Sequence, residues 1–167
     1  MAAPAASRPK LAVLDTNVLF HLAEQHAPAH NLVRRLLRSG ITPIVTQTVV
    51  QELAFAEQKG GTLKKRTSAG TALKEMLQWG IQPVGLKPVG NGICAIAADV
   101  IASRGLLPER ERNDAFILIE AAFCGASMLI TWDDHLLSAS QDGLSAVLVS
   151  FDLHPVQIVD PSTILAD

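Results

Sequence analysis

Residues 11–20 read LAVLDTNVLF, an apolar run interrupted by Asp15, Thr16 and Asn17 before hydrophobic residues resume. The apolar residues 11–14 are too few for a helix and lead into a polar turn, which predicts a short buried strand. Apolar residues with helical spacing follow the turn. Asp15 therefore either caps a helix at the end of a strand, or is held at the edge of the core for chemistry.

The composition is that of a folded domain. A chain of 167 residues, 49% hydrophobic and 18% charged, can bury one substantial core and is not disordered. No apolar stretch is long enough to span a membrane, and the N-terminus lacks the pattern of a secretory signal. Cys94 and Cys124 lie alone in apolar helical patterns, which favours reduced thiols. We expect residues 1–10 to form a flexible tail, residues 11–167 a single domain, and the protein to be cytoplasmic.

Short apolar runs alternate with helical patterns along the chain. Further strands are predicted at 42–46, 81–86 and 128–131, each preceded by at least one helical segment. This alternation predicts an α/β domain with a mainly parallel sheet and helices on both faces. In such a domain the strand C-terminal ends lie at one edge, where ligands bind.

Three local patterns add detail. Residues 48–60 are predicted to be a helix, with Thr48 and Gln51 spaced like a capping box. The segment 87–92 reads as a loop before an apolar helix; it contains GNGICA, a formal dinucleotide fingerprint to which we give little weight because it lies mid-chain after a doubtful strand. Residues 145–165 are expected to hold one or two strands and a closing helical turn.

Acidic residues follow the predicted strands. Asp15 ends the first strand, Glu52 lies in the first turn of the helix after the second, and Asp133 and Asp134 follow the strand 128–131. Asp114 lies near the start of the helix that feeds this strand, although spacing leaves its height open. Each acid could simply cap or favour a helix N-terminus. Together, converging carboxylates would repel one another without a cation, and oxygen ligands suit Mg²⁺ or Mn²⁺.

Basic residues are unevenly distributed. The net charge is −2, yet eight Lys and Arg lie between Arg34 and Lys74 against two acids, and none follows Arg112. A cationic surface could therefore lie beside an anionic centre, although a solvated helix face is the commoner cause of such a cluster. The candidates for contacts with the phosphates of a nucleic acid are Arg34, Arg35, Arg38, Lys64, Lys65 and Arg66. Trp132 could stack on a base, but we expect it to pack in the core.

With these acids in this order, the chain resembles the PIN-domain ribonuclease family, which includes the toxins of bacterial toxin–antitoxin pairs. The matching segments, in the family's order, are LDTNVL (14–19), Glu52 in TVVQEL, NDAFILIEAA (113–122), LITWDD (129–134) and the closing VQIVDPSTIL (156–165). The resemblance implies a three-layer α/β/α fold with a mainly parallel central sheet of about five strands. It also implies that Asp114 joins the other acids.

The resemblance implies a metal-dependent endoribonuclease that cleaves single-stranded RNA. Mg²⁺ or Mn²⁺ would be held by the catalytic acids Asp15, Asp114, Asp133 and Glu52. Asn17 and Thr131 would position a carboxylate or the phosphate, and Asp134 could share or take the role of Asp133. Whether one or two metal ions bind is left open.

The family also implies a homodimer and, if the chain is a toxin, an antitoxin partner. The segment from Lys59 to Arg112 is longer than in the most compact toxins, which favours a larger branch of the family. Two other enzyme classes are excluded by single residues: a dehalogenase-type phosphatase needs Asp at position 17, and a receiver domain needs a Lys after Lys87. The alternative is a catalytically weak PIN-like module that binds RNA or serves assembly.

Overall fold

The computed structural model describes residues 10–166. Its centre is a sheet of five strands: β1 (Lys10–Leu14), β2 (Ile41–Val45), β3 (Gln82–Pro83), β4 (Met128–Ile130) and β5 (Gln157–Val159). The strand order is β3-β2-β1-β4-β5, and every pair is parallel. The predicted parallel sheet is therefore confirmed. Lys10, which we assigned to the tail, is the first residue of β1, and the rest of that segment lies outside the described residues.

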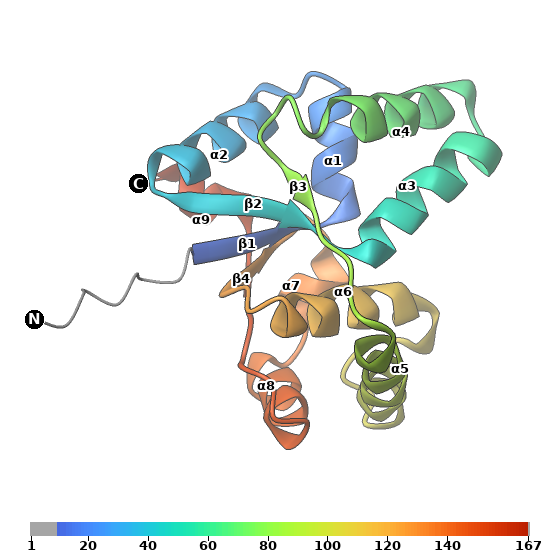
Figure 1. The fold of residues 1–167 in the computed structure, drawn as a ribbon, viewed down its shortest axis with the longest axis vertical. Coiled ribbons are helices and arrows are strands. Elements are labelled where there is room, and N and C mark those ends of the chain that lie inside the picture. Colours follow the sequence, from blue (N-terminus) through green and yellow to red (C-terminus); the bar gives the residue numbers. More distant parts are fainter. Residues whose placement is uncertain (1–9, 167) are drawn as a thin grey trace, which may run out of the picture.

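Helices cover both faces of this sheet. They are α1 (Thr16–Ala23), α2 (Ala27–Arg38), α3 (Gln47–Lys59), α4 (Leu63–Glu75), α5 (Pro88–Ser103), α6 (Arg112–Phe123), α7 (Asp134–Ser138), α8 (Gln141–Ser150) and α9 (Pro161–Ala166), with a short 3₁₀ turn at Glu109–Glu111. Figure 1 shows α1, α2 and α4 on one side of the sheet and α5 and α8 on the other. The predicted three-layer α/β/α architecture is confirmed. None of the helices within residues 10–166 has the length and apolar composition that a membrane crossing requires.

The strand order creates a place for a ligand beside β1. From β1 the chain proceeds to β2 and β3 on one side, then returns to β4 and β5 on the other. The connections after β1 and after β4 therefore lead to opposite faces and leave a crevice beyond the C-terminal ends of these two strands. Asp15 follows β1 directly, at this crevice.

The central strand and α6 form the middle of the core. Ala12, Val13 and Leu14 of β1 are completely buried, because both faces of a central parallel strand are covered. Ile117 and Leu118 of α6 are equally buried. The strongly apolar patterns of these two segments thus reflect burial on all sides rather than on one face.

The predicted capping box at Thr48 and Gln51 is wrong. Thr46 precedes α3 without a side-chain capping hydrogen bond. Thr48 lies inside the first turn, where its backbone N–H donates to Glu120 Oε2 over 3.1 Å and its hydroxyl donates to Oε1 over 2.8 Å. A buried acid from α6 therefore takes the place of a local cap.

One other local prediction needs correction, and one is confirmed. The segment 87–92 is not a loop, because α5 begins at Pro88; GNGICA therefore lies inside a helix and lacks the strand–loop–helix context of a dinucleotide site. Residues 145–150 belong to α8, in which Leu144, Val147 and Leu148 are buried at helical spacing. The rest of the segment holds one strand, β5, and the closing helix α9, as predicted.

Candidate functional site

Asp15 is held by hydrogen bonds on both carboxylate oxygens. Its side chain is buried, with an exposed fraction of 4%. Oδ1 accepts from the backbone N–H of Thr16 over 2.6 Å. Oδ2 accepts from the Thr131 hydroxyl over 2.6 Å and from the Asn17 amide over 2.8 Å. The side chains of Asn17 and Thr131 are themselves 3.0 Å apart, so this polar group fixes the orientation of the carboxylate between β1 and β4.

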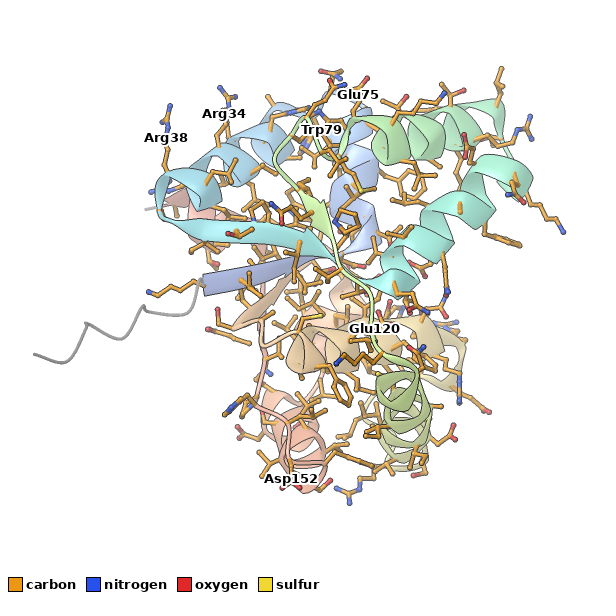
Figure 2. All side chains as sticks on the ribbon, viewed as in Figure 1. Arg34, Arg38, Glu75, Trp79, Glu120 and Asp152 are labelled. Carbon is orange, nitrogen blue, oxygen red and sulfur yellow. The ribbon has the colours of Figure 1, made fainter. Side chains whose placement is uncertain are left out.

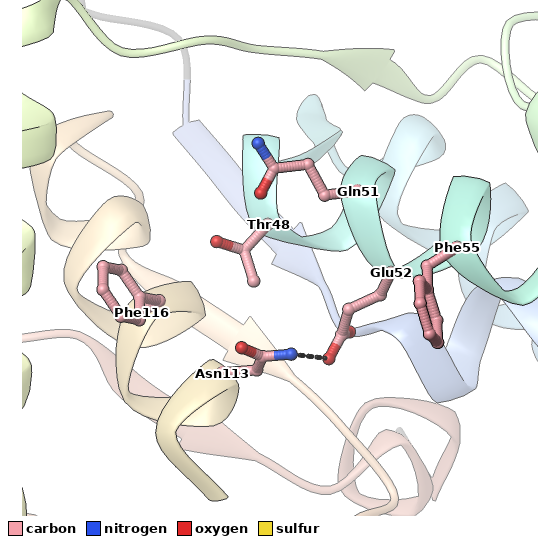
Figure 3. Close-up of a pocket in the computed structure, with 6 residues that line it drawn as sticks. All are labelled: Thr48, Gln51, Glu52, Phe55, Asn113 and Phe116. Carbon is pink, nitrogen blue, oxygen red and sulfur yellow. Dashed lines mark hydrogen bonds between the residues drawn. The ribbon is translucent and has the colours of Figure 1, made fainter.

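Glu52 connects three helices at the same edge. It lies on α3, one turn after the buried Thr48. The Thr16 hydroxyl of α1 donates to Glu52 Oε2, and the Asn113 amide of α6 donates to Oε1 over 2.9 Å (Figure 3). Neither Thr16 nor Asn113 was singled out in the sequence, because their role depends on side-chain contacts between distant segments.

Asp114 lies in the first turn of α6 and has a buried oxygen without a partner. Its Oδ2 accepts no hydrogen bond within the described structure. Burial and the negative charges of Asp15 and Asp133, with smaller effects from Glu111 and Glu52, raise the pKa of Asp114 from 3.8 to about 8. An unsatisfied buried carboxylate is unfavourable, which indicates an oxygen that is available to a cation.

Asp133 follows β4 and caps α7. Its Oδ1 accepts from the backbone N–H groups of His135 over 2.7 Å and Leu136 over 3.3 Å. Its own N–H donates to the Thr131 hydroxyl over 2.8 Å. Asp134 is the exposed first residue of α7. The structure thus brings Asp133 to the site and leaves Asp134 outside.

These four acids line one pocket of about 430 Å³ at the carboxyl ends of β1 and β4. Its lining residues are Asp15, Thr16, Asn17, Phe20, Glu52, Phe55, Ala56, Lys59, Gly60, Gly61, Lys65, Asn113, Asp114 and Asp133. Burial, the main cause, and the charges of Glu52 and Asp133 raise the pKa of Asp15 to about 6, against the lowering effect of its hydrogen bonds from Thr131 and Thr16. Carboxyl groups therefore outnumber bases in the pocket, with four acids against Lys59 and Lys65.

The donor set fits a hard divalent cation. The pocket offers carboxylate, amide and hydroxyl oxygens, which Mg²⁺ and Mn²⁺ prefer, and the unpartnered oxygen of Asp114 is available to such an ion. No three or more His, Cys, Asp or Glu side chains within residues 10–166 are already gathered at metal-binding distances. Hydrogen bonds from neighbouring residues occupy oxygens of Asp15, Glu52 and Asp133 instead.

The predicted basic residues divide into two groups. Arg34, Arg35 and Arg38 of α2 line a separate pocket with Leu165, and Arg35 donates to the Leu165 carbonyl over 3.1 Å. α2 ends just before β2 begins, so its arginines lie toward the edge where strands start, whereas the carboxylates follow the strand ends. Figure 2 shows Arg34 and Arg38 on α2. The expected cationic surface beside the acids therefore does not include α2.

The second group consists of Lys64, Lys65 and Arg66 and lies nearer the carboxylates. Of these three, Lys65 alone lines the carboxylate pocket. Lys64 pairs with Glu24 over 3.1 Å, and Arg66 donates to the Gly60 carbonyl over 3.0 Å. Lys65 does line the pocket, together with Lys59, which we had not singled out.

The sequence did contain a signal for the missed residues of α3. Phe55 and Lys59 follow Glu52 by three and seven positions, a spacing that places all three on one helix face.

Comparisons with known proteins agree with this fold. Residues 12–140 match the sequence model of a family described as PIN domain. Among solved structures, VapBC2 from Rickettsia felis bound to a DNA fragment from its promoter matches at 16% identity and a TM-score of 0.61, covering 90% of this chain and 98% of that one. VapBC-5 from Mycobacterium tuberculosis, of a family of toxin–antitoxin systems, matches at 19% identity and a TM-score of 0.56, covering 91% and 99%. No curated protein matches the sequence significantly.

Proposed function

Because the chain belongs to the PIN-domain family, whose members are generally nucleases, we propose that it is a metal-dependent endoribonuclease that hydrolyses phosphodiester bonds of single-stranded RNA. The observation that carries this proposal is the convergence of four acids from separate elements on one pocket: Asp15, Glu52, Asp114 and Asp133. Carboxylates that repel one another destabilise the folded protein when no cation is bound, and a bound cation removes that penalty. A scaffold that only binds RNA would have no use for this arrangement.

The four acids are the proposed ligands of Mg²⁺ or Mn²⁺. Such an ion lowers the pKa of water and neutralises the charge that builds up on a phosphate during hydrolysis. Asp114 is central to this assignment, because its buried Oδ2 has no other partner among the described residues.

The surrounding residues hold the acids in place and admit the substrate. Asn17 and Thr131 keep Asp15 oriented, while Thr16 and Asn113 do the same for Glu52. Lys59 and Lys65 supply positive charge at the same pocket, where the phosphates of a polyanion would otherwise meet only acids.

An antitoxin partner and a homodimer are part of the proposal. VapBC-5 is by title a member of a family of toxin–antitoxin systems, and at 19% identity it supports the fold rather than the partner. Exposed apolar side chains at Leu77 and Ile96 give this chain surface that a protein could cover. Light scattering of the purified protein tests the dimer, and co-expression with the neighbouring gene product tests the antitoxin.

Cleavage of assorted single-stranded RNAs with and without Mn²⁺ tests the nuclease. We expect Asp15→Asn to slow Mn²⁺-dependent cleavage by about 100-fold or more, since even residues that support metal ligands are worth 10- to 100-fold. Asp142→Asn, at an exposed position of α8, is the matched control and should cleave normally. Full activity in a folded Asp15→Asn protein would contradict the assignment.

Comparison of Asp133→Asn with Asp134→Asn tests which of the two neighbouring acids acts. We expect loss of cleavage in the first and little change in the second, because the pocket is lined by Asp133. The opposite result would transfer the role to Asp134.

A further inference from the structure

One large aromatic side chain stands exposed beside the carboxylates. Phe55 on α3 has an exposed fraction of 64%, although it follows Glu52 by a single helical turn. Figure 3 shows its ring next to Glu52, on the same side of α3. Leaving an aromatic ring in water is unfavourable, and exposed aromatic groups beside a polar site are typical of ligand-binding surfaces.

Phe55 lies between two adjoining pockets. One is the carboxylate pocket, and the other, of about 400 Å³, lies between α3 and α6 and is lined by Thr48, Gln51, Glu52, Phe55, Asn113 and Phe116. The two pockets share Glu52, Phe55 and Asn113. The two pockets therefore adjoin, and the ring of Phe55 lines both of them.

The other aromatic residues near the site are already packed. Phe20, which lines the carboxylate pocket, is partly buried and packs against the core. Trp132 packs edge-on against His21, with ring centroids 4.9 Å apart, which agrees with its expected packing role. Arg112 lies over the ring of Phe116, 5.5 Å from its centroid. Within residues 10–166, none of the close aromatic or cation–π pairs includes Phe55, so its ring face is open.

Positive charge lies next to this ring. Lys59 is one turn beyond Phe55 on α3, and Lys65 lines the same pocket from α4. Neither lysine forms an ion pair with another side chain in the described part of the chain. An aromatic ring flanked by ammonium groups matches the alternation of bases and phosphates in a single strand.

We propose that Phe55 is a stacking platform for an unpaired nucleobase, next to the phosphate held at the carboxylates, with Lys59 and Lys65 binding flanking phosphates. The inference rests on the proposed ribonuclease function and adds to it the way in which the strand is held. Every base has a π-face, so stacking here tolerates any sequence but requires a base free of its duplex partner. Phe55 thus favours single strands over duplexes.

Binding of a short oligoribonucleotide that carries 2-aminopurine tests the proposal in buffer with Ca²⁺ and no Mn²⁺. We expect the wild type to quench 2-aminopurine fluorescence on binding. Phe55→Ala should lose this quenching and bind about tenfold or more weakly, and Phe55→Tyr should restore both. Val149→Ala, which removes an exposed apolar side chain from α8, is the matched control and should behave as the wild type.

The salt dependence separates stacking from phosphate contacts. Phe55→Ala should leave the slope of log Kd against log salt unchanged, whereas Lys59→Ala and Lys65→Ala should each reduce it by about 0.7. Equal affinity and equal quenching in Phe55→Ala, or no oligonucleotide binding by the wild type, would overturn the proposal. So would a Phe55→Ala protein that loses self-association in sedimentation while it binds the oligonucleotide normally, because the ring then covers a protein contact.

The proposed function can fail independently of this inference. Binding and quenching that depend on Phe55, without any Mn²⁺-dependent cleavage, would support the platform and contradict the nuclease. Cleavage by Phe55→Ala at the wild-type rate, with unchanged affinity, would support the nuclease and contradict the platform.

Discussion

The carboxylate of Asp114 destabilises the folded protein, while its unpartnered oxygen stays available to a cation. Its folded-state pKa of about 8 lies above the ordinary value of 3.8, so the folded state binds its proton more tightly than the unfolded state. Stability from this group is therefore present at low pH and is lost as the pH rises through 8. Asp15, with a pKa of about 6, acts in the same direction over a lower range.

Substitution of Asp114 tests this destabilising effect. In metal-free buffer at pH 9 we expect Asp114→Asn to raise the free energy of unfolding by about 1–3 kcal/mol, after allowance for solvent screening of the partly exposed group. The gain should disappear near pH 4, where the wild-type residue is also neutral. Urea unfolding at both values measures the difference, with Asp142→Asn as control. A loss of stability at pH 9 would show that the carboxylate is satisfied.

At the residue scale, the sequence predicted positions better than contacts. Asp15 and Asp133 could be placed because Asp15 directly follows one strand of a parallel sheet and Asp133 lies just past the end of another. The hydrogen bonds of Thr16 and Asn113 to Glu52 could not be predicted, since they depend on side chains brought together by the packing of α1 and α6 against α3.

At the element scale, one buried acid fixes α3 relative to α6. Glu120, with 3% exposure, accepts from both the N–H and the hydroxyl of Thr48, 72 positions away along the chain. These two helices carry Glu52 and Asp114, so the contact also sets the distance between two proposed metal ligands. No local pattern could have shown that a distant residue replaces the helix cap.

Removal of this acid should destabilise the fold. Glu120→Ala leaves two donors of Thr48 without a partner in the core, and we expect a loss of about 2–4 kcal/mol in the free energy of unfolding. Glu109→Ala, at an exposed position outside the core, should change stability by less than about 0.5 kcal/mol. Chemical denaturation of both variants measures this. A neutral effect of Glu120→Ala would mean that water or another side chain satisfies Thr48.

At the scale of the whole molecule, strand order decides where charges lie. The parallel sheet was predictable from the alternation of short apolar runs and helices, and it correctly placed the acids at one edge. The sequence could not place the arginines of α2, because that requires knowing at which end of the helix they fall relative to β2. Their density in the sequence indicated one cationic surface, while the structure divides it between opposite edges of the sheet.

This division predicts unequal effects of two charge removals. Lys65→Gln should slow RNA cleavage at low substrate about tenfold and weaken its salt dependence, since this lysine lines the carboxylate pocket. Arg38→Gln, at the opposite edge, should change the rate by less than about twofold. Cleavage at several salt concentrations compares them. A larger effect of Arg38→Gln would mean that the RNA path crosses α2.

The central claim is that four carboxylates form one divalent-cation site. The most direct test is titration of the metal-free protein with Mn²⁺, in which the loss of the paramagnetic resonance signal of the free ion measures binding. We predict saturable Mn²⁺ binding that strengthens between pH 6 and 8, as Asp15 and Asp114 lose their protons. Asp114→Asn should abolish this binding. Binding that is absent in the wild type, or unchanged in Asp114→Asn, would contradict it.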